Sequence, residues 1–173
     1  LFRSYVNYAE QACACAGYAR KNLSLFDEIC LITNTETLEP NEKLINEYFD
    51  RVIVSDSFQP DNVRLFKDTV DKLEYASFKN MGRSEVYDLS PYDETLVIDA
   101  DYFIMNNVLD QVWDSENDVM INCKYRDVSG RHKENIEYLD NFSIPMYWAT
   151  VFYFKKSDFA ENLFTLISHI KYN

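Results

Sequence analysis

Residues 92–108 read YDETLVIDADYFIMNNV, and this stretch decides the fold. Within it, residues 96–98 (LVI) form a short apolar run that ends directly at residues 99–101 (DAD). A continuously apolar run of this length, bounded by turn-forming residues, is typical of a strand covered on both faces, as in a parallel sheet between helices. Ligands of open α/β sheets bind beyond the carboxyl ends of the strands, so we expect Asp99 and Asp101 to lie at a ligand site.

Outward from this strand, the apolar spacing alternates between helical and extended. Strands that alternate with helices predict a single α/β domain over residues 1–173, with a mostly parallel central sheet flanked by helices. The elements expected before the strand are a helix over 5–20, a strand over 29–32, a helix opened at 40–42 and capped by Asn41, a strand over 52–54, and a helix from 59–61 toward 75 or 81. Those expected after it are strands over 119–121 and 151–154 and a last helix whose apolar residues run from 159 to 170. Residues 124–145 show no periodicity and are expected to form a long loop or lid.

Composition limits the classes of function. The formal net charge of -12 opposes binding to nucleic acid or to an anionic membrane surface. Only 3 glycines are present, which argues against a glycine-rich phosphate loop. No secretory signal or long apolar span is found, so no membrane segment and a cytoplasmic location are expected. The four cysteines match no zinc-binding spacing and predict reduced thiols; they are Cys13, Cys15, Cys30 and Cys123.

Two carboxylates one residue apart at a strand end suit a hard cation. Mg²⁺ or Mn²⁺ needs only one or two protein carboxylates when substrate phosphates and water complete its coordination. Asp99 and Asp101 therefore predict a metal site, which would allow this acidic protein to bind an anionic nucleotide. The alternative is that both aspartates merely end the strand in a turn by accepting main-chain hydrogen bonds.

Residues 92–108 resemble the strand, the D-x-D motif and the following turn of metal-dependent glycosyltransferases of the GT-A fold. Residues 76–81 (ASFKNM) resemble the helix that brings a basic residue to the sugar nucleotide in some of these enzymes. Residues 146–156 lie where the family has a strand near the acceptor and the donor sugar. The resemblance implies a nucleotide-diphospho-sugar transferase-like fold, Mn²⁺ or Mg²⁺ as cofactor, a nucleoside-diphosphate sugar as donor, with a UDP-sugar favoured, and a glycan or other hydroxyl acceptor.

The same resemblance implies roles for individual residues, whereas nothing in the sequence identifies a catalytic base. Asp101 would bind the metal directly, and Asp99 would contact the ribose or a metal-bound water. The other expected contacts are Lys79 and Arg83 to the diphosphate or donor sugar, Thr33 and Asn34 to the base or ribose, and Tyr147, Trp148 and Asn122 to the acceptor or sugar. For the two basic residues the alternative is a solvated helix charge, and for the two aromatic residues it is core packing.

Two other functions stay open at this point. One is a phosphatase of the haloacid dehalogenase type, in which the first aspartate of a similar D-x-D motif, here Asp99, is the nucleophile. The other is a non-catalytic remnant of a glycosyltransferase domain. GT-A enzymes normally open with a strand that helps to hold the nucleotide base, and many supply a third metal ligand after the last helix. The domain is therefore expected to be incomplete at both ends.

Overall fold

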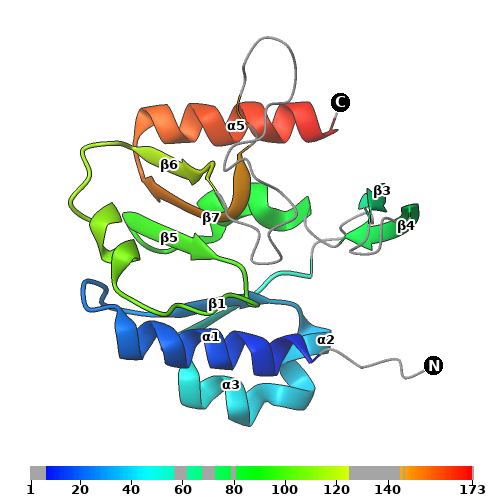
Figure 1. Ribbon diagram of the computed structural model, residues 1–173, viewed down its shortest axis with the longest axis vertical. Helices are drawn as coiled ribbons and strands as arrows, with labels where there is room; N and C mark the ends of the chain where they lie inside the picture. The colour runs from blue at the N-terminus through cyan, green and yellow to red at the C-terminus, as the bar shows by residue number, and fades with distance from the viewer. Residues whose placement is uncertain are drawn as a thin grey trace.

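The computed structural model describes residues 7–56, 62–67, 73–78, 81–124, 145 and 147–172, which form a mixed α/β arrangement (Figure 1). The elements from the amino terminus are α1 (Tyr8–Asn22), β1 (Cys30–Thr33), α2 (Thr35–Leu38), the 3-10 turn η1 (Glu39–Asn41), α3 (Glu42–Tyr48), β2 (Arg51–Val54), β3 (Asn62–Lys67) and β4 (Leu73–Phe78). They continue with η2 (Met81–Glu85), α4 (Val86–Leu89), β5 (Glu94–Ile98), η3 (Val108–Val112), β6 (Val119–Asn122), β7 (Trp148–Lys155) and α5 (Asp158–Tyr172).

The described strands form three separate hydrogen-bonded sets. β1 and β2 pair in parallel, β3 and β4 form an antiparallel pair, and β7 lies between β5 and β6, antiparallel to both. The described strands therefore do not form the mostly parallel central sheet that was predicted, although the mixed α/β class is confirmed. The strands were predicted from apolar runs, and an apolar run indicates only that both faces of the strand are buried. Its composition is the same beside a parallel or an antiparallel neighbour.

The segment expected to be a helix from 59–61 onward contains the β3–β4 pair instead. Asn62 lies opposite Phe78, and Lys67 lies opposite Leu73. The helical prediction used the spacing of Val63, Phe66 and Leu73, but short apolar segments can satisfy a helical and an alternating period at once. Here the extended conformation is the one found.

Helix α1 was expected over 5–20 and is found from Tyr8 to Asn22, with Asn7 as a cap that was not predicted. The side chain of Asn7 accepts hydrogen bonds from the main-chain N–H groups of Ala9 and Glu10, at 3.1 and 3.4 Å. Asn41, which was expected to cap α3, makes no such hydrogen bond; its Nδ2 donates to the carbonyl of Thr37, at 2.9 Å. The helix α3 was thus predicted correctly and its cap was not.

The buried residues of the described chain fall into three clusters rather than one. The α1–α3 cluster contains Ala9, Cys13 and Ile45, with Leu31 and Val52 against it. The α1–β5 cluster contains Cys15, Ala19, Leu23 and Ile104, with Ile29 and Ile98 against it. The aromatic cluster contains Val86, Phe152, Phe154 and Phe164, with Ile32 and Val97 against it. A domain of this size usually has one contiguous core, whereas the described part of this chain has three separate buried clusters.

Cys13 and Cys15 are buried, and all four cysteines are free thiols. Desolvation is the main cause that raises the pKa of the thiols of Cys13, Cys15 and Cys30. None of the helices in the described part of the chain combines the length and the apolar character needed to cross a bilayer.

Candidate functional site

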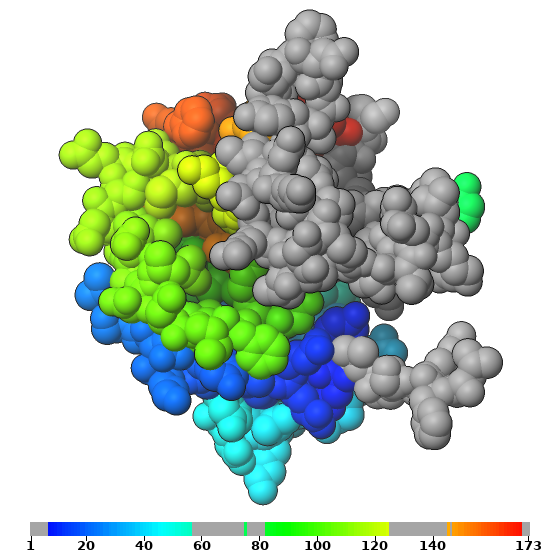
Figure 2. All heavy atoms as spheres, in the orientation of Figure 1, coloured from blue at the N-terminus to red at the C-terminus, as the bar shows by residue number. Residues whose placement is uncertain are grey.

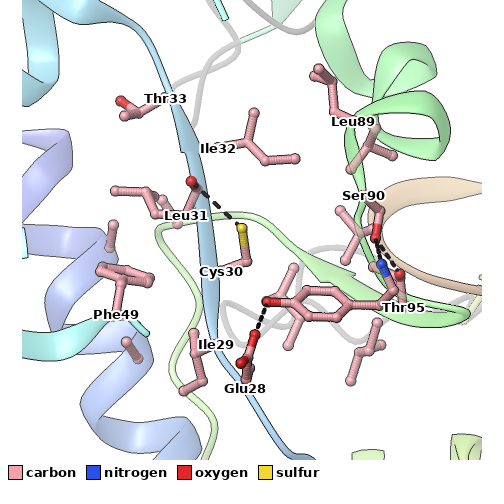
Figure 3. Close-up of a pocket in the computed structure, with 18 of the residues that line it drawn as sticks. Glu28, Ile29, Cys30, Leu31, Ile32, Thr33, Phe49, Leu89, Ser90 and Thr95 are labelled. Atoms are coloured by element: carbon pink, nitrogen blue, oxygen red, sulfur yellow. Dashed lines mark hydrogen bonds between the residues drawn. The ribbon is translucent and has the colours of Figure 1, made fainter. Parts of the chain in front are cut away.

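A cavity of about 1550 Å³ lies between β1 and β5 (Figure 3). Both strands line it along their length, from the start of each to the residues just beyond its end. Thr33 and Asn34 reach it from the end of β1, and Asp99 and Arg83 reach it from the end of β5 and from η2. Four of the residues predicted to contact a nucleotide therefore share one edge of one cavity.

Arg83 and Asp99 form a bidentate ion pair at this edge of the cavity. The Nε atom of Arg83 donates to Oδ1 of Asp99 at 3.1 Å, and Nη2 donates to Oδ2. Both side chains are half-buried, with 31% of the Arg83 side chain and 24% of the Asp99 side chain exposed. Because the guanidinium presents several N–H groups in a plane, this pairing fixes its orientation and leaves further N–H groups for another acceptor.

The burial of Asp99 works against its charge. Desolvation raises the pKa of the Asp99 carboxyl above its ordinary value, and the nearby Asp101 carboxylate raises it further. The charge of Arg83 and its hydrogen bonds oppose this rise and offset it only in part. A second cation at this position would therefore stabilise the ionised carboxylate.

Asp101 lies in the turn that follows β5 and is exposed to solvent. The N–H of Tyr102 donates to the carbonyl of Asp99, at 3.3 Å, which closes this turn. In the same segment the hydroxyls of Tyr102 and Thr150 lie 2.9 Å apart, so the turn is tied to β7. The turn thus holds the carboxylate of Asp101 in solvent close to the Arg83–Asp99 pair.

The segment after the turn is anchored on α1. Asn22 donates through Nδ2 to the carbonyl of Ile104 at 2.7 Å, and Ile104 is buried against Cys15 and Leu23. Figure 2 shows this segment packed beside α1 on the face in view. The position of Asp101 therefore depends on the packing of α1 as well as on β5.

At the end of β1, Asn34 already has a local role. Its Oδ1 atom accepts a hydrogen bond from the N–H of Thr37 at 3.0 Å, which caps the short helix α2. The hydroxyl of Thr35 donates to Asp56, and the N–H of Thr35 donates to the same carboxylate at 2.7 Å. Thr33 is half-buried and lines the cavity. Of the two residues predicted to contact the base or ribose, Thr33 is thus the one without a capping role.

Tyr147, Trp148 and Asn122 meet at the beginning of β7. Asn122, the last residue of β6, lies opposite Trp148 in the register. Because β7 runs antiparallel to β5, with Ile98 opposite Val151, its beginning lies at the edge where β5 ends. The three residues lie at the same edge as Asp99 but do not line the cavity, and 54% of Tyr147 is exposed. The Lys79 prediction lies outside the described residues.

Several residues at the site were not predicted. Thr150 is one, since its carbonyl accepts the N–H of Asp99 at 2.9 Å and its hydroxyl contacts Tyr102. Cys15 is another, since its Sγ lies 4.0 Å from the carbonyl of Asp99. The small-residue spacing of α1 places Cys15 on the buried face of the helix. No local pattern reveals that this face contacts the end of the distant strand β5.

The carboxylates at this edge could hold a divalent cation only if a bound ligand and water completed its coordination. Within the described residues, no three His, Cys, Asp or Glu side chains gather in an arrangement that could hold a metal ion. The exposed carboxylate of Asp101, with the Asp99 carboxylate nearby, supplies one or two oxygen ligands. That number suffices for Mg²⁺ or Mn²⁺ when phosphate oxygens and waters fill the other positions.

No protein-family model matches this chain, and no curated protein and no solved structure is significantly similar to it.

Proposed function

We propose that this domain transfers a sugar from a nucleoside-diphosphate sugar to an acceptor hydroxyl. The observation that carries the proposal is the Arg83–Asp99 ion pair at the end of β5, with the exposed carboxylate of Asp101 two residues further on. A fixed guanidinium beside a carboxylate open to solvent is a combination that suits a diphosphate together with a divalent cation. The donor proposed first is a UDP-sugar.

The charges at this edge match the difficulty of the reaction. As the bond between sugar and diphosphate breaks, negative charge develops on the leaving diphosphate. The guanidinium of Arg83, oriented by Asp99, would bind that charge directly through the N–H groups that Asp99 does not use. Mg²⁺ or Mn²⁺, held by Asp101 with Asp99 nearby, would supply Lewis-acid stabilisation of the same phosphates.

The other residues of this edge have supporting positions in the proposal. Thr33 would contact the ribose or base from β1, on the opposite wall of the cavity. Tyr147 and Trp148, at the beginning of β7, would contact the acceptor or the donor sugar. Aromatic side chains at such positions commonly pack against the apolar faces of ligands.

Calorimetric titration of UDP-sugars, with and without Mn²⁺, tests this proposal. We expect binding that requires Mn²⁺, and a loss of affinity of about tenfold or more, roughly 1.4 kcal/mol, in Asp101→Ala and in Arg83→Gln. The matched control is Asp93→Ala, because Asp93 is an exposed carboxylate beside the opposite end of β5. Equal affinities for Asp101→Ala and Asp93→Ala would remove the D-x-D motif from the proposed site.

Two outcomes would favour the alternatives. In the phosphatase alternative Asp99 is the nucleophile, and trapping of an acyl-phosphate on Asp99 would favour this alternative. Both oxygens of Asp99 accept hydrogen bonds from Arg83, and this pairing argues against a nucleophilic role. A folded protein that binds no sugar nucleotide at any Mn²⁺ concentration would favour the non-catalytic remnant.

A further inference from the structure

The Arg83–Asp99 ion pair occupies the first carboxylate of the D-x-D motif. Both oxygens of Asp99 accept hydrogen bonds from the guanidinium, from Nε at 3.1 Å and from Nη2. Hydrogen bonds between ionised groups are about twice as strong as neutral ones, and a bidentate pair also fixes the geometry. The Asp99 carboxylate is therefore already paired with a cation that belongs to the chain itself.

Both partners are held in place by the elements that carry them. The N–H of Asp99 donates to the carbonyl of Thr150 at 2.9 Å, which ties Asp99 to β7. Arg83 lies in η2, and the next residue, Ser84, is buried, as is Val86 at the start of α4. Both side chains of the pair are half-buried, so solvent screens their charges less than it screens an exposed pair. The pair is thus a preformed part of the site.

The pair changes the charge that a metal ion meets at this edge of the cavity. Asp99 and Asp101 carry two negative charges, and the guanidinium of Arg83 cancels one of them. A cation that bound the remaining lone pairs of Asp99 would also lie close to the guanidinium, and like charges repel. Of the two aspartates, Asp101 is then the one whose carboxylate stays open to a cation, because it is exposed in the turn after β5.

One open carboxylate is a weak ligand set for Mg²⁺ or Mn²⁺. Such an ion gives up its waters reluctantly and is usually held by one or two carboxylates together with substrate phosphates. A diphosphate supplies both things that are missing at this edge. Its oxygens complete the coordination, and its negative charge pairs with the N–H groups of Arg83 that Asp99 does not use. The same guanidinium thus opposes a bare cation and favours one that arrives with a diphosphate.

We propose that Arg83 is a selectivity residue, which keeps divalent cations from binding to the D-x-D motif alone and admits them together with a diphosphate. This inference rests on the proposed sugar-nucleotide site and adds how that site is filled. Coupling between two ligands is reciprocal, so the diphosphate raises the affinity for the cation by the same factor by which the cation raises the affinity for the diphosphate. Each ligand alone would then bind weakly.

The proposal gives the loss of Arg83 two effects of opposite sign. Without the guanidinium, both Asp99 and Asp101 face the cation, and the site carries one more negative charge, so binding of Mn²⁺ alone should become tighter. The same loss removes a contact to the diphosphate, so binding of a UDP-sugar with Mn²⁺ should become weaker. An ion pair with a purely structural role predicts no gain in affinity for Mn²⁺ alone.

Titration of Mn²⁺ without nucleotide tests the proposal, with free Mn²⁺ measured by electron paramagnetic resonance. We expect Arg83→Gln to bind Mn²⁺ about tenfold more tightly than the unmodified chain does. The matched control is Arg51→Gln, which removes the same charge beside Glu28, at the opposite end of the cavity. It should leave the affinity unchanged. The double variant Arg83→Gln with Asp99→Asn should return to the unmodified affinity, because the gain depends on the freed Asp99 carboxylate.

Arg83→Lys keeps the test decisive if thermal unfolding shows that Arg83→Gln does not fold. Lysine retains the charge but cannot form the bidentate pair, so one oxygen of Asp99 is released, and a smaller gain of about threefold is expected. An unchanged or lower affinity for Mn²⁺ in the folded Arg83 variant overturns the proposal. An equal gain in Arg51→Gln overturns it too, as does a gain that persists after Asp99→Asn.

Failure of this proposal and failure of the transferase proposal give different results. Tighter Mn²⁺ binding in Arg83→Gln, with no UDP-sugar bound by the unmodified chain, supports the exclusion of bare cations by Arg83 and removes the transferase function. Binding of a UDP-sugar with Mn²⁺ by the unmodified chain, with no change of Mn²⁺ affinity in Arg83→Gln, keeps the transferase function and overturns the role of Arg83.

Discussion

The hydroxyl of Tyr92 donates a hydrogen bond of 2.8 Å to the carboxylate of Glu28, across the end of the cavity at which β1 and β5 begin. Arg51 joins this contact, with its Nε 3.5 Å from Glu28 and its guanidinium over the Tyr92 ring. The three side chains come from the loops before β1 and β5 and from β2. They therefore connect two sets of strands that share no main-chain ladder.

Tyr92→Phe is expected to lower the stability at neutral pH by up to about 1 kcal/mol, because one partly exposed hydrogen bond is lost. Desolvation and the hydrogen bond to Glu28 raise the pKa of Tyr92 from 10.0 to about 12. A raised pKa contributes stability below pH 10 that is lost as the pH rises toward 12. Thermal unfolding at several pH values should show this alkaline loss in the unmodified protein and a smaller one in the variant. Tyr8→Phe is the control, since Tyr8 is 65% exposed; an identical alkaline profile for both variants would contradict the assignment.

Asp110→Ala is expected to destabilise the protein by about 2–3 kcal/mol, because several hydrogen bonds to a buried carboxylate are lost together. The carboxylate of Asp110 is 6% exposed and accepts the N–H and the hydroxyl of Ser24 and the N–H of Leu25, at 3.0 to 3.3 Å. Urea unfolding measures the loss. Asp114→Ala, at an exposed position nearby, should stay within about 0.5 kcal/mol of the unmodified protein. Equal effects of the two substitutions would show that Asp110 does not hold the loop after α1.

Phe164→Ala is expected to cost about 3–5 kcal/mol, because it opens a hole in the aromatic cluster. Phe164 is 7% exposed, and its ring centroid lies 5.0 Å from that of Tyr87 and 5.4 Å from that of Phe154. Phe159, on the same helix, is 61% exposed and provides a control of identical chemistry. Chemical denaturation of the two alanine variants should separate them by several kcal/mol. A difference below about 1 kcal/mol would mean that α5 does not seal this cluster.

Asp50→Asn is expected to lower the stability at neutral pH and to make the stability depend less on acid. Asp50 accepts the N–H of Ile29 and pairs with Arg20, each at 2.7 Å, and the Ile29 hydrogen bond is the main cause that lowers the pKa of Asp50 below 3.8. A lowered pKa contributes stability that is present above pH 3.8 and lost as the pH falls through the folded-state value. The stability difference between the unmodified protein and the variant should therefore shrink below pH 3.8. Asp27→Asn, at an exposed position, should show no such trend, and a parallel trend in both would contradict the role of Asp50.

Element positions could be predicted from local sequence wherever burial is periodic. The helices α1, α3 and α5 and the strands β1, β2, β5, β6 and β7 lie close to their predicted positions, because apolar side chains follow the period of each element. Strand direction could not be predicted, since a run such as residues 96–98 is equally apolar beside a parallel or an antiparallel neighbour. The β3–β4 pair was missed because the apolar residues from Val63 to Leu73 also fit a helical period.

At the site, the positions of the residues were predicted better from the sequence than their interaction partners were. Asp99 and Asp101 lie at the end of β5, as its apolar run and the D-x-D spacing predict. Arg83 was expected at a phosphate and is found paired with Asp99. Asn34 was expected at a base and is found capping α2. Such partners depend on contacts between segments that are distant in the chain, and local spacing carries no information about them.

The central place of β7 has a consequence for the order of events during synthesis. Among the described strands, both β5 and β6 pair only with β7, which lies about fifty residues beyond β5 and carries the buried Phe152, Tyr153 and Phe154. Pairings between distant segments form slowly because a long loop must close first. A ribosome must therefore deliver residue 155 before Leu96 and Ile121 gain a strand partner, and until then the nascent chain carries apolar segments that a chaperone would be expected to bind.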